Sequence, residues 1–265
     1  MSVAPLVDTD RYPIDRPEAR AYAHWAAECR HAFREEAVLL LPGFLRADIV
    51  AELASEAATL VPQAFFCRNK HNVYLDGVDA ARGEDHLRNR LLRTDVGSIA
   101  NDLIAAGSRL QQLYESDQLI RFIAEVVGVD QLHISADPLG ALSINVFAPG
   151  DAHAWHFDEA RFTVTLMLQP AEVGGHFEYV RGLRDDGDMG DVDSIGRLVG
   201  DSSLAGTHMP FEPGTLSVFS GHNTIHRVTR VEGGRPRLVP VLTYSNEPGY
   251  RNSDAVRKLF WGRSS

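Results

Sequence analysis

The stretch Leu142-Ser-Ile-Asn-Val-Phe147 alternates apolar and polar residues, as a strand does when one of its faces lies in a core. Further short runs of this kind follow it, separated by Pro-Gly and Gly-Gly turns, at 162–168, 176–180, 215–219 and 238–244. Repeated short strands with turns between them predict a closed antiparallel double sheet of the jelly-roll, or cupin-like, type.

Helical patterns come before these strands. Apolar residues recur at helical spacing in the segments 18–36, 48–60 and 108–128, with Asp48 placed to cap the second. A buried strand closed by a Pro-Gly turn is expected at 38–45. Helices first and strands later predict an α+β fold, in which N-terminal helices buttress one sheet of a β core.

The whole chain, 1–265, is expected to form a single domain. Residues 1–131 would supply a helical and loop elaboration, 132–248 the jelly-roll core, and 249–265 a C-terminal tail. The polar segment 64–94 lacks periodicity, and irregular stretches of this length are often lids or binding loops.

The composition limits the possible partners. The 36 acidic and 26 basic side chains give a formal charge of −10, which disfavours non-specific binding to nucleic acid or to an anionic membrane. The sequence shows no secretory signal pattern, and no apolar run nears the roughly 20 residues needed to span a bilayer. Cys29 and Cys67 are too few for a disulfide framework and are expected to be reduced thiols. We therefore expect a cytoplasmic protein, monomeric or homodimeric, with neither nucleic acid nor a membrane as partner.

Two imidazoles and a carboxylate stand out in the β-rich half. His156 and Asp158 are two residues apart, so on a strand both side chains would project from one face while Phe157 points the other way into packing. His226 follows another predicted strand and would return to the same mouth of the barrel. This donor set holds a non-haem Fe(II) on one face and leaves the opposite face open for dioxygen and a co-substrate. Arg237, eleven residues beyond His226, adds a fixed cation nearby.

Other residues compete for these roles. His153 lies three residues before the first of these histidines, a spacing that puts it on the opposite face of a strand. His222 and His226 have the spacing of helical zinc peptidases, but Asn223 stands where that motif needs its general-base Glu. The acidic run at 184–193 lacks the ligand spacing of an EF-hand, so we expect an insert between strands that acts as a lid.

These residues and their surroundings resemble the double-stranded β-helix oxygenases that depend on iron(II) and 2-oxoglutarate. The resemblance is carried by His156-Phe-Asp-Glu-Ala-Arg-Phe-Thr-Val-Thr-Leu-Met-Leu-Gln169, Gly174-Gly-His-Phe-Glu-Tyr-Val180, Pro213-Gly-Thr-Leu-Ser-Val-Phe219 and His226-Arg-Val-Thr-Arg-Val-Glu-Gly233, with Arg237-Leu-Val239 beyond them. It extends to His71-Asn-Val-Tyr-Leu75 and to 136–146, and so covers most of the chain. It is closest to the subgroup that hydroxylates or halogenates free amino acids such as lysine.

The resemblance implies roles for particular residues. His156, Asp158 and His226 match the iron ligands. Arg237 matches the residue that binds the distal carboxylate of 2-oxoglutarate, a task that suits the planar fork of a guanidinium. Arg235, on the same strand face but nearer the turn, is the alternative.

The same resemblance bears on the reaction. Ser143 and Asn145 would contact the co-substrate, and the cofactors would be iron(II), 2-oxoglutarate and dioxygen, with no catalytic side chain beyond the metal centre. The resembling halogenases have a Gly or Ala where Asp158 stands, so its carboxylate implies a dioxygenase that hydroxylates an unactivated C–H bond. The small-molecule substrate would be a free amino acid or an amino-acid derivative.

Other functions fit less well. The same fold also supports desaturation or halogenation driven by 2-oxoglutarate. A zinc-type hydrolase or isomerase is disfavoured by Arg237, because hydrolysis needs no buried cation for a co-substrate. A non-enzymatic ligand sensor is disfavoured by the complete set of ligands.

Candidate substrate-binding residues lie in the polar segment and beside the ligands. They share a charge or hydrogen-bonding group suited to a zwitterion: Arg68, His71, Asn72, Asp76, Glu159 and Arg161. Trp155 and Trp261 are candidates for the wall of the pocket.

Overall fold

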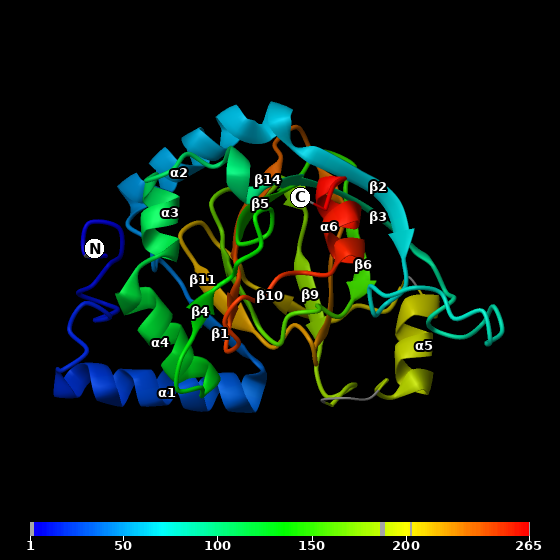
Figure 1. Ribbon diagram of the computed structural model, residues 1–265, viewed down its shortest axis with the longest axis horizontal. Coiled ribbons are helices and arrows are strands. Elements are labelled where there is room, and N and C mark those ends of the chain that lie inside the picture. The colour runs from blue at the N-terminus through cyan, green and yellow to red at the C-terminus, as the bar shows by residue number, and fades with distance from the viewer. Residues whose placement is uncertain (1–2, 186–188, 202, 265) are drawn as a thin grey trace.

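A computed structural model describes residues 3–185, 189–201 and 203–264. Two antiparallel sheets face each other, and helices from the N-terminal half cover the outer face of the larger sheet (Figure 1). The prediction of an α+β jelly roll buttressed by N-terminal helices is confirmed.

The larger sheet has seven strands. In spatial order they are β1 (Val38–Leu41), β11 (Leu216–Phe219), β7 (Thr163–Leu166), β14 (Arg237–Leu242), β5 (Leu142–Phe147), β3 (Leu92–Ile99) and β2 (Phe65–His71). The smaller sheet has the order β10 (Thr207–Met209), β9 (Phe177–Val180), β12 (Ile225–Val228) and β6 (His153–His156). Two short pairs complete the β structure, β13 (Val231–Glu232) with β8 (Val173–Gly174) and β15 (Tyr244–Ser245) with β4 (His133–Ile134).

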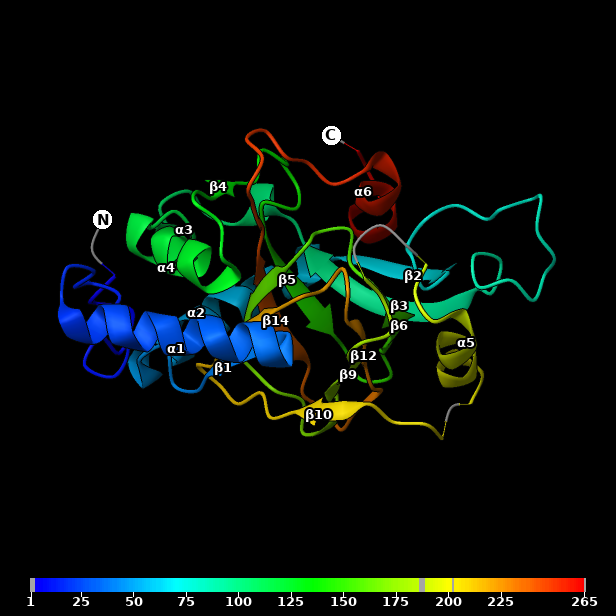
Figure 2. The same cartoon turned by 90° about the horizontal axis from the view of Figure 1, so that it is seen from below.

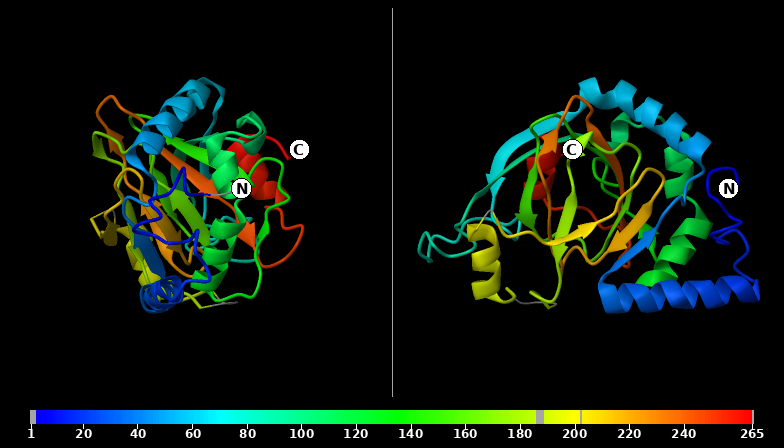
Figure 3. Two further views of the ribbon diagram at one scale, coloured as in Figure 1. Left: turned by 90° about the vertical axis from the view of Figure 1, so that its left-hand side faces the viewer. Right: turned by 180° about the vertical axis from the view of Figure 1, so that it is seen from behind.

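The helices lie on different sides of the sheets. They are α1 (Arg20–Glu36), α2 (Ala47–Leu60), α3 (Arg109–Tyr114), α4 (Asp117–Val127), α5 (Val192–Gly200) and α6 (Asp254–Trp261), with short 3-10 turns η1 (Val61–Gln63) and η2 (Asn101–Leu103). The first four share one hydrophobic core with the larger sheet, whereas α5 lies on the side of the sheets away from α3 and α4 (Figures 2 and 3). Within the described ranges, no helix combines the length and the apolar character needed to cross a membrane.

The alternation in β5 lets one sheet serve both a core and a cavity. Leu142, Ile144 and Val146 are at most 2% exposed and pack against the helices. Ser143 and Asn145 point the other way, into the space between the sheets. Burying each aliphatic side chain contributes roughly 1.5–3 kcal/mol. A one-residue shift in the register of β5 would move every side chain to the opposite face of the sheet. Burial of the three aliphatic residues against the helices therefore determines which residues reach the cavity.

The sequence suggested that the segment 64–94 is irregular, but the structure shows strands at both of its ends. Its first part is β2 and its end begins β3, and both strands belong to the larger sheet. β2 is hard to recognise because it is an edge strand whose residues are mostly polar and exposed, with only Cys67 and His71 buried. Edge strands commonly carry charged and polar side chains, which hides their alternation.

Two helix predictions also need correction. The N-cap of α2 is Arg46 rather than Asp48. Asp48 lies in the first turn, where its negative charge interacts favourably with the positive end of the helix dipole. The single helix expected at 108–128 is two helices, α3 and α4, and the second ends at Gly128 in the left-handed conformation. Of the predicted acidic insert at 184–193, residues 186–188 fall outside the described residues, and its last two residues begin α5, which lies between β9 and β10 in the chain.

Candidate active site

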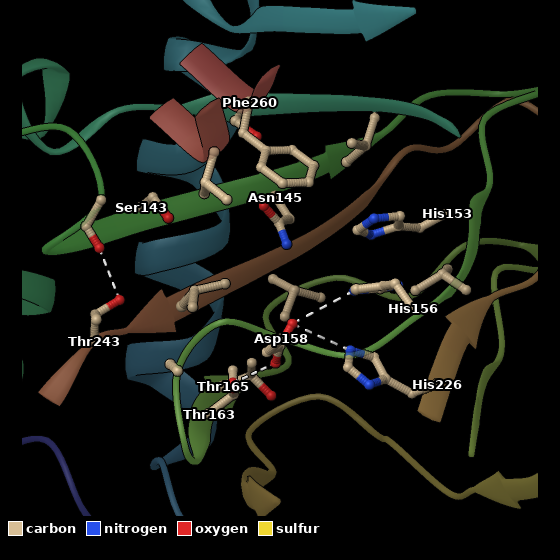
Figure 4. A pocket seen from close by; sticks show the side chains of 18 of the residues that line it. Ser143, Asn145, His153, His156, Asp158, Thr163, Thr165, His226, Thr243 and Phe260 are labelled. Atoms are coloured by element: carbon tan, nitrogen blue, oxygen red, sulfur yellow. Dashed lines mark hydrogen bonds and ion pairs between the residues drawn. The ribbon is translucent and has the colours of Figure 1, made fainter. Parts of the chain in front are cut away.

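The candidate ligands come from two neighbouring strands of the smaller sheet. His156 ends β6 and is the register partner of His226 on β12, so the two ring centroids lie 4.1 Å apart. Asp158 follows β6 by two residues, and its Oδ1 lies 3.5 Å from the Nε2 atom of each histidine (Figure 4). One donor atom from each residue lies within 4.8 Å of the others, a spacing that one metal ion can bridge.

Backbone carbonyls determine which nitrogen of each imidazole faces the carboxylate. His156 Nδ1 lies 2.8 Å from the Ala154 oxygen, and His226 Nδ1 lies 2.9 Å from the Thr224 oxygen. Each Nδ1–H donates to its carbonyl and leaves the Nε2 lone pair for a metal, as is usual for metal-binding histidines. Burial lowers the pKa of His156, which favours the neutral form that metal binding requires.

Asp158 is held in place from three sides. Its backbone N–H donates to the Gly221 oxygen at 3.0 Å, and Thr163 Oγ1 donates to its Oδ2 at 2.5 Å. A Cβ at Gly221 would lie 2.2 Å from Oδ2, so the carboxylate occupies space that only glycine leaves open. Burial alone would raise the pKa of Asp158, but His226 and His156 outweigh it and hold the pKa well below its usual range. The side chain is therefore an anion at neutral pH.

Phe157 points away from the ligands, as predicted. It is fully buried on the other side of the strand, where its ring stacks on Tyr74 at 5.9 Å between centroids. Its backbone N–H donates to the Val73 oxygen at 2.7 Å. The segment that precedes the barrel thus supports the ligand strand from behind.

The prediction that His153 faces away from His156 is wrong. Both residues line the same cavity, and their rings stack at 3.8 Å between centroids. The three steps on β6 from His153 to His156 oppose only two on β12, from Val228 to His226. The extra residue is a β-bulge, which twists the strand and turns His153 back toward the ligands.

Arg237 is a buried cation on the floor of the same cavity. It opens β14 opposite Phe147 and is 3% exposed, with its guanidinium carbon 5.3 Å from the Phe147 ring and 5.8 Å from the Phe211 ring. Its Nε makes no hydrogen bond to any described residue. Burial lowers the pKa of Arg237 to about 9, which still leaves it charged at neutral pH. A buried guanidinium with an unpaired Nε suits a carboxylate ligand.

Arg237 and the alternative, Arg235, lie in different environments. Arg235 is exposed, and its Nε donates to the Pro170 oxygen at 3.1 Å. Ser143 and Asn145, predicted to contact the co-substrate, line the cavity with Arg237 (Figure 4).

Of the predicted substrate-binding residues, Glu159 lines the cavity. It is exposed at the mouth, and its Oε2 accepts a hydrogen bond from the Ser253 backbone N–H at 3.1 Å. Arg161 is exposed and does not line the cavity. Arg68 lies on β2, where it forms ion pairs with Asp151 and Asp95.

The other three predicted residues support the loop rather than the cavity surface. His71 is buried behind His156, with Nε2 hydrogen-bonded to Thr94 Oγ1 at 2.6 Å, and burial lowers its pKa to about 4. Asn72 is fully buried and donates to Asp76 Oδ1 at 2.9 Å. Neither these two residues nor Asp76 lines the cavity.

The segment predicted as a tail forms part of the site. α6 packs on β2 and β3 and brings Val256, Phe260 and Trp261 to the cavity wall, so Trp261 lies where the sequence suggested, whereas Trp155 lies outside. Ser253 caps this helix by accepting from the Val256 N–H at 3.2 Å. A serine followed by apolar residues at helical spacing is the sequence signal that identifies α6.

Comparison with known proteins agrees with this geometry. The model of a family described as Halogenase D matches residues 22–258. The chain belongs to the Halogenase D family. The predicted resemblance to iron(II)/2-oxoglutarate oxygenases is confirmed, and with it the expectation of an enzyme of this class. A search of curated proteins finds no match.

Solved structures share the fold of this Halogenase D family member. An oxidoreductase of the 2OG-Fe(II) oxygenase family from Burkholderia pseudomallei is 17% identical, with a TM-score of 0.51 over 84% of this chain and 91% of that one. AviO1 from Streptomyces viridochromogenes Tue57 is 15% identical, with a TM-score of 0.53 over 86% and 97%. The α-ketoglutarate-dependent epimerase SnoN from nogalamycin biosynthesis is 16% identical, with a TM-score of 0.58 over 84% and 81%. At these identities the likeness concerns the fold.

Proposed function

We propose that the protein is an iron(II)- and 2-oxoglutarate-dependent dioxygenase that hydroxylates an unactivated C–H bond of a small substrate, an amino acid or an amino-acid derivative. The observation that carries this proposal is the Asp158 carboxylate, held 3.5 Å from the Nε2 atoms of His156 and His226. Two neutral imidazoles and a carboxylate on one face are the ligand set of non-haem Fe(II) oxygenases.

Each group of residues has a part in this reaction. His156, Asp158 and His226 hold the iron, and Arg237, whose Nε is unpaired among the described residues, binds the distal carboxylate of 2-oxoglutarate. Ser143 and Asn145 orient the co-substrate from β5. Dioxygen would be the oxidant, activated at iron(II): one of its oxygen atoms would enter the substrate C–H bond and the other 2-oxoglutarate, which would be released as succinate and carbon dioxide. The protein's own task is to orient the substrate C–H bond and to keep water away.

Hydroxylation is favoured over halogenation even though the family is named for a halogenase. The resembling halogenases leave the third ligand position to a Gly or Ala, which makes room for a halide. Here Thr163 donates a hydrogen bond to the Asp158 carboxylate. Gly221 has no side chain and so leaves the space that this carboxylate occupies.

A spectroscopic titration tests this proposal. Adding Fe(II) and 2-oxoglutarate without oxygen should produce the weak visible charge-transfer band of the chelated metal. Asp158→Ala should abolish hydroxylation, whereas Glu84→Ala, at an exposed position outside the cavity, should leave it intact. No band, together with tight binding of zinc, would rule out the oxygenase.

Location and substrate type have support of their own. Cys29 and Cys67 are both buried and unpaired, and burial raises the pKa of each thiol, which suits the reducing cytoplasm. Glu159 at the cavity mouth provides a counter-charge for the amine of an amino-acid-like substrate.

A further inference from the structure

Two exposed histidines lie side by side on the outer face of the smaller sheet, away from the cavity. His176 immediately precedes β9 and His208 lies within β10, and their ring centroids are 4.5 Å apart at an interplanar angle of 76°. Phe177 and Met209, which follow these histidines in the chain, are buried on the inner side of the same strands. Because successive side chains of a strand face opposite ways, both imidazoles point to solvent.

Backbone pairing holds the two side chains next to each other. His208 is the register partner of Glu178, which lies two residues after His176, so the two histidines are diagonal neighbours on one face. The backbone N–H of His176 donates to Thr229 Oγ1 at 2.9 Å, and its carbonyl oxygen accepts from the Thr229 N–H at 2.9 Å. The sheet therefore fixes the backbone of the pair, while the exposed rings can rotate.

The nitrogen atoms of this pair are unused. Within the described ranges, neither imidazole makes a hydrogen bond or an ion pair, and each ring packs against the other. The neighbouring carboxylate, Glu178, is already neutralised, because its Oε2 accepts from Arg227 Nε at 2.8 Å. The pair thus offers two nitrogen donors without a carboxylate of its own.

The spacing of the rings suits one metal ion bound by both. A zinc–nitrogen bond of about 2.0–2.1 Å places the ion about 3.2 Å from each ring centre, so two imidazoles at a tetrahedral angle have centres about 5 Å apart. The candidate iron ligands His156 and His226 have ring centroids 4.1 Å apart. The 4.5 Å between His176 and His208 lies between these values, so a small rotation of the exposed rings directs a nitrogen of each toward one ion.

The donors of the outer pair favour a different ion from the one proposed for the cavity. Iron(II) stands low in the order of affinities of divalent metals for a given set of ligands, and the inner site adds the Asp158 carboxylate to its imidazoles. Imidazoles bind Ni(II), Cu(II) and Zn(II) more strongly than iron(II). Among the described residues the inner site is the sole group of three potential protein ligands, so water completes the coordination at the outer pair.

We propose that His176 and His208 form a second metal site, which binds a late divalent transition metal such as Zn(II) through two imidazoles and water. The ion joins β9 to β10, the edge strand of the smaller sheet, whose pairing in the described structure is with β9 (Figure 2). Because Phe177 of β9 lines the cavity, the ion supports the cavity wall from outside. The site lies on the opposite face of the sheet from the candidate iron ligands, so it does not depend on the proposed reaction.

Zinc titration of the unsubstituted protein and its variants tests this site. His176→Gln and His208→Gln each remove one donor and keep a polar, exposed side chain. At a zinc concentration that saturates the unsubstituted protein, each variant should bind one ion fewer per chain, as counted by calorimetry. The double variant should lose the same single ion, because both rings serve one site. His31→Gln, at an exposed position on α1, is the control and should lose none.

Chemical labelling gives a second readout that does not depend on counting ions. Zn(II) should protect both His176 and His208 from carbethoxylation by diethyl pyrocarbonate, measured by peptide mass spectrometry, and should leave His31 reactive. If either single variant binds as many ions as the unsubstituted protein, or the double variant loses two, the shared site is refuted. Failure of Zn(II) to protect both rings would refute it equally.

Discussion

Replacing Thr163 with Val tests whether the iron site depends on the group that orients its carboxylate. The hydroxyl donates to Asp158 Oδ2 at 2.5 Å, so Thr163→Val removes one charge-assisted hydrogen bond and keeps the volume of the side chain. Such bonds contribute roughly 1.5–3 kcal/mol. At about 1.4 kcal/mol for each factor of ten, the Kd for iron(II) should rise about 10- to 100-fold.

A second threonine on the same strand supplies the control. Thr165 also lines the cavity, but its hydroxyl is hydrogen-bonded to Ser217 at 2.6 Å and does not contact a ligand. Thr165→Val should lower the free energy of unfolding by about 1 kcal/mol and leave the Kd for iron(II) unchanged. Both constants are measured by anaerobic titration of Fe(II) in the presence of 2-oxoglutarate, with thermal unfolding of the metal-free protein alongside. If Thr163→Val binds iron within twofold of the unsubstituted protein, or both variants lose the same affinity, Thr163 does not orient the carboxylate.

Three further predictions follow from the cavity. Gly221→Ala places a Cβ 2.2 Å from Asp158 Oδ2, so we expect iron affinity to fall at least about 100-fold while circular dichroism stays unchanged; retained affinity would show that the carboxylate can move aside. Arg237→Met removes a buried cation that has no ion-pair partner among the described residues, so it should abolish 2-oxoglutarate binding yet raise the free energy of unfolding of the metal-free protein in urea; a less stable variant would contradict this. Because burial lowers the pKa of Arg237 to about 9, the guanidinium loses its proton as the pH rises through that value. The affinity for 2-oxoglutarate should therefore fall above about pH 9, and calorimetric titrations that show a constant Kd to pH 10 would show that the guanidinium stays charged and that burial does not lower its pKa this far.

The sequence predicts the ligand set because it depends on the simplest rule of a strand. Alternate side chains share a face, so His156 and Asp158 could be paired, and Phe157 assigned to packing, without knowledge of the fold. The same rule fails at His153, because a bulge depends on how β6 pairs with β12, some seventy residues away in the chain.

Long-range packing also explains what the sequence does not reveal about the wall of the site. β2 has too few buried residues to show alternation, and it becomes a strand through its pairing with β3 and its cover by α6. The sequence shows which residues in the segment 64–94 can form hydrogen bonds, but it does not show whether their side chains point into the cavity or into the loop. Asn72 and His71 therefore read equally well as substrate contacts and as the supports of a loop.

The contact between Gly221 and Asp158 has a consequence for how this family diverges. A Cβ at position 221 would meet the Asp158 carboxylate most closely, at 2.2 Å from Oδ2, and Thr163 Oγ1 less closely, at 2.9 Å. In a relative that has a Gly or Ala at position 158, a side chain at position 221 would meet no carboxylate oxygen. The two positions should therefore vary together across the Halogenase D family, with larger residues at 221 confined to members that have lost the acid at 158.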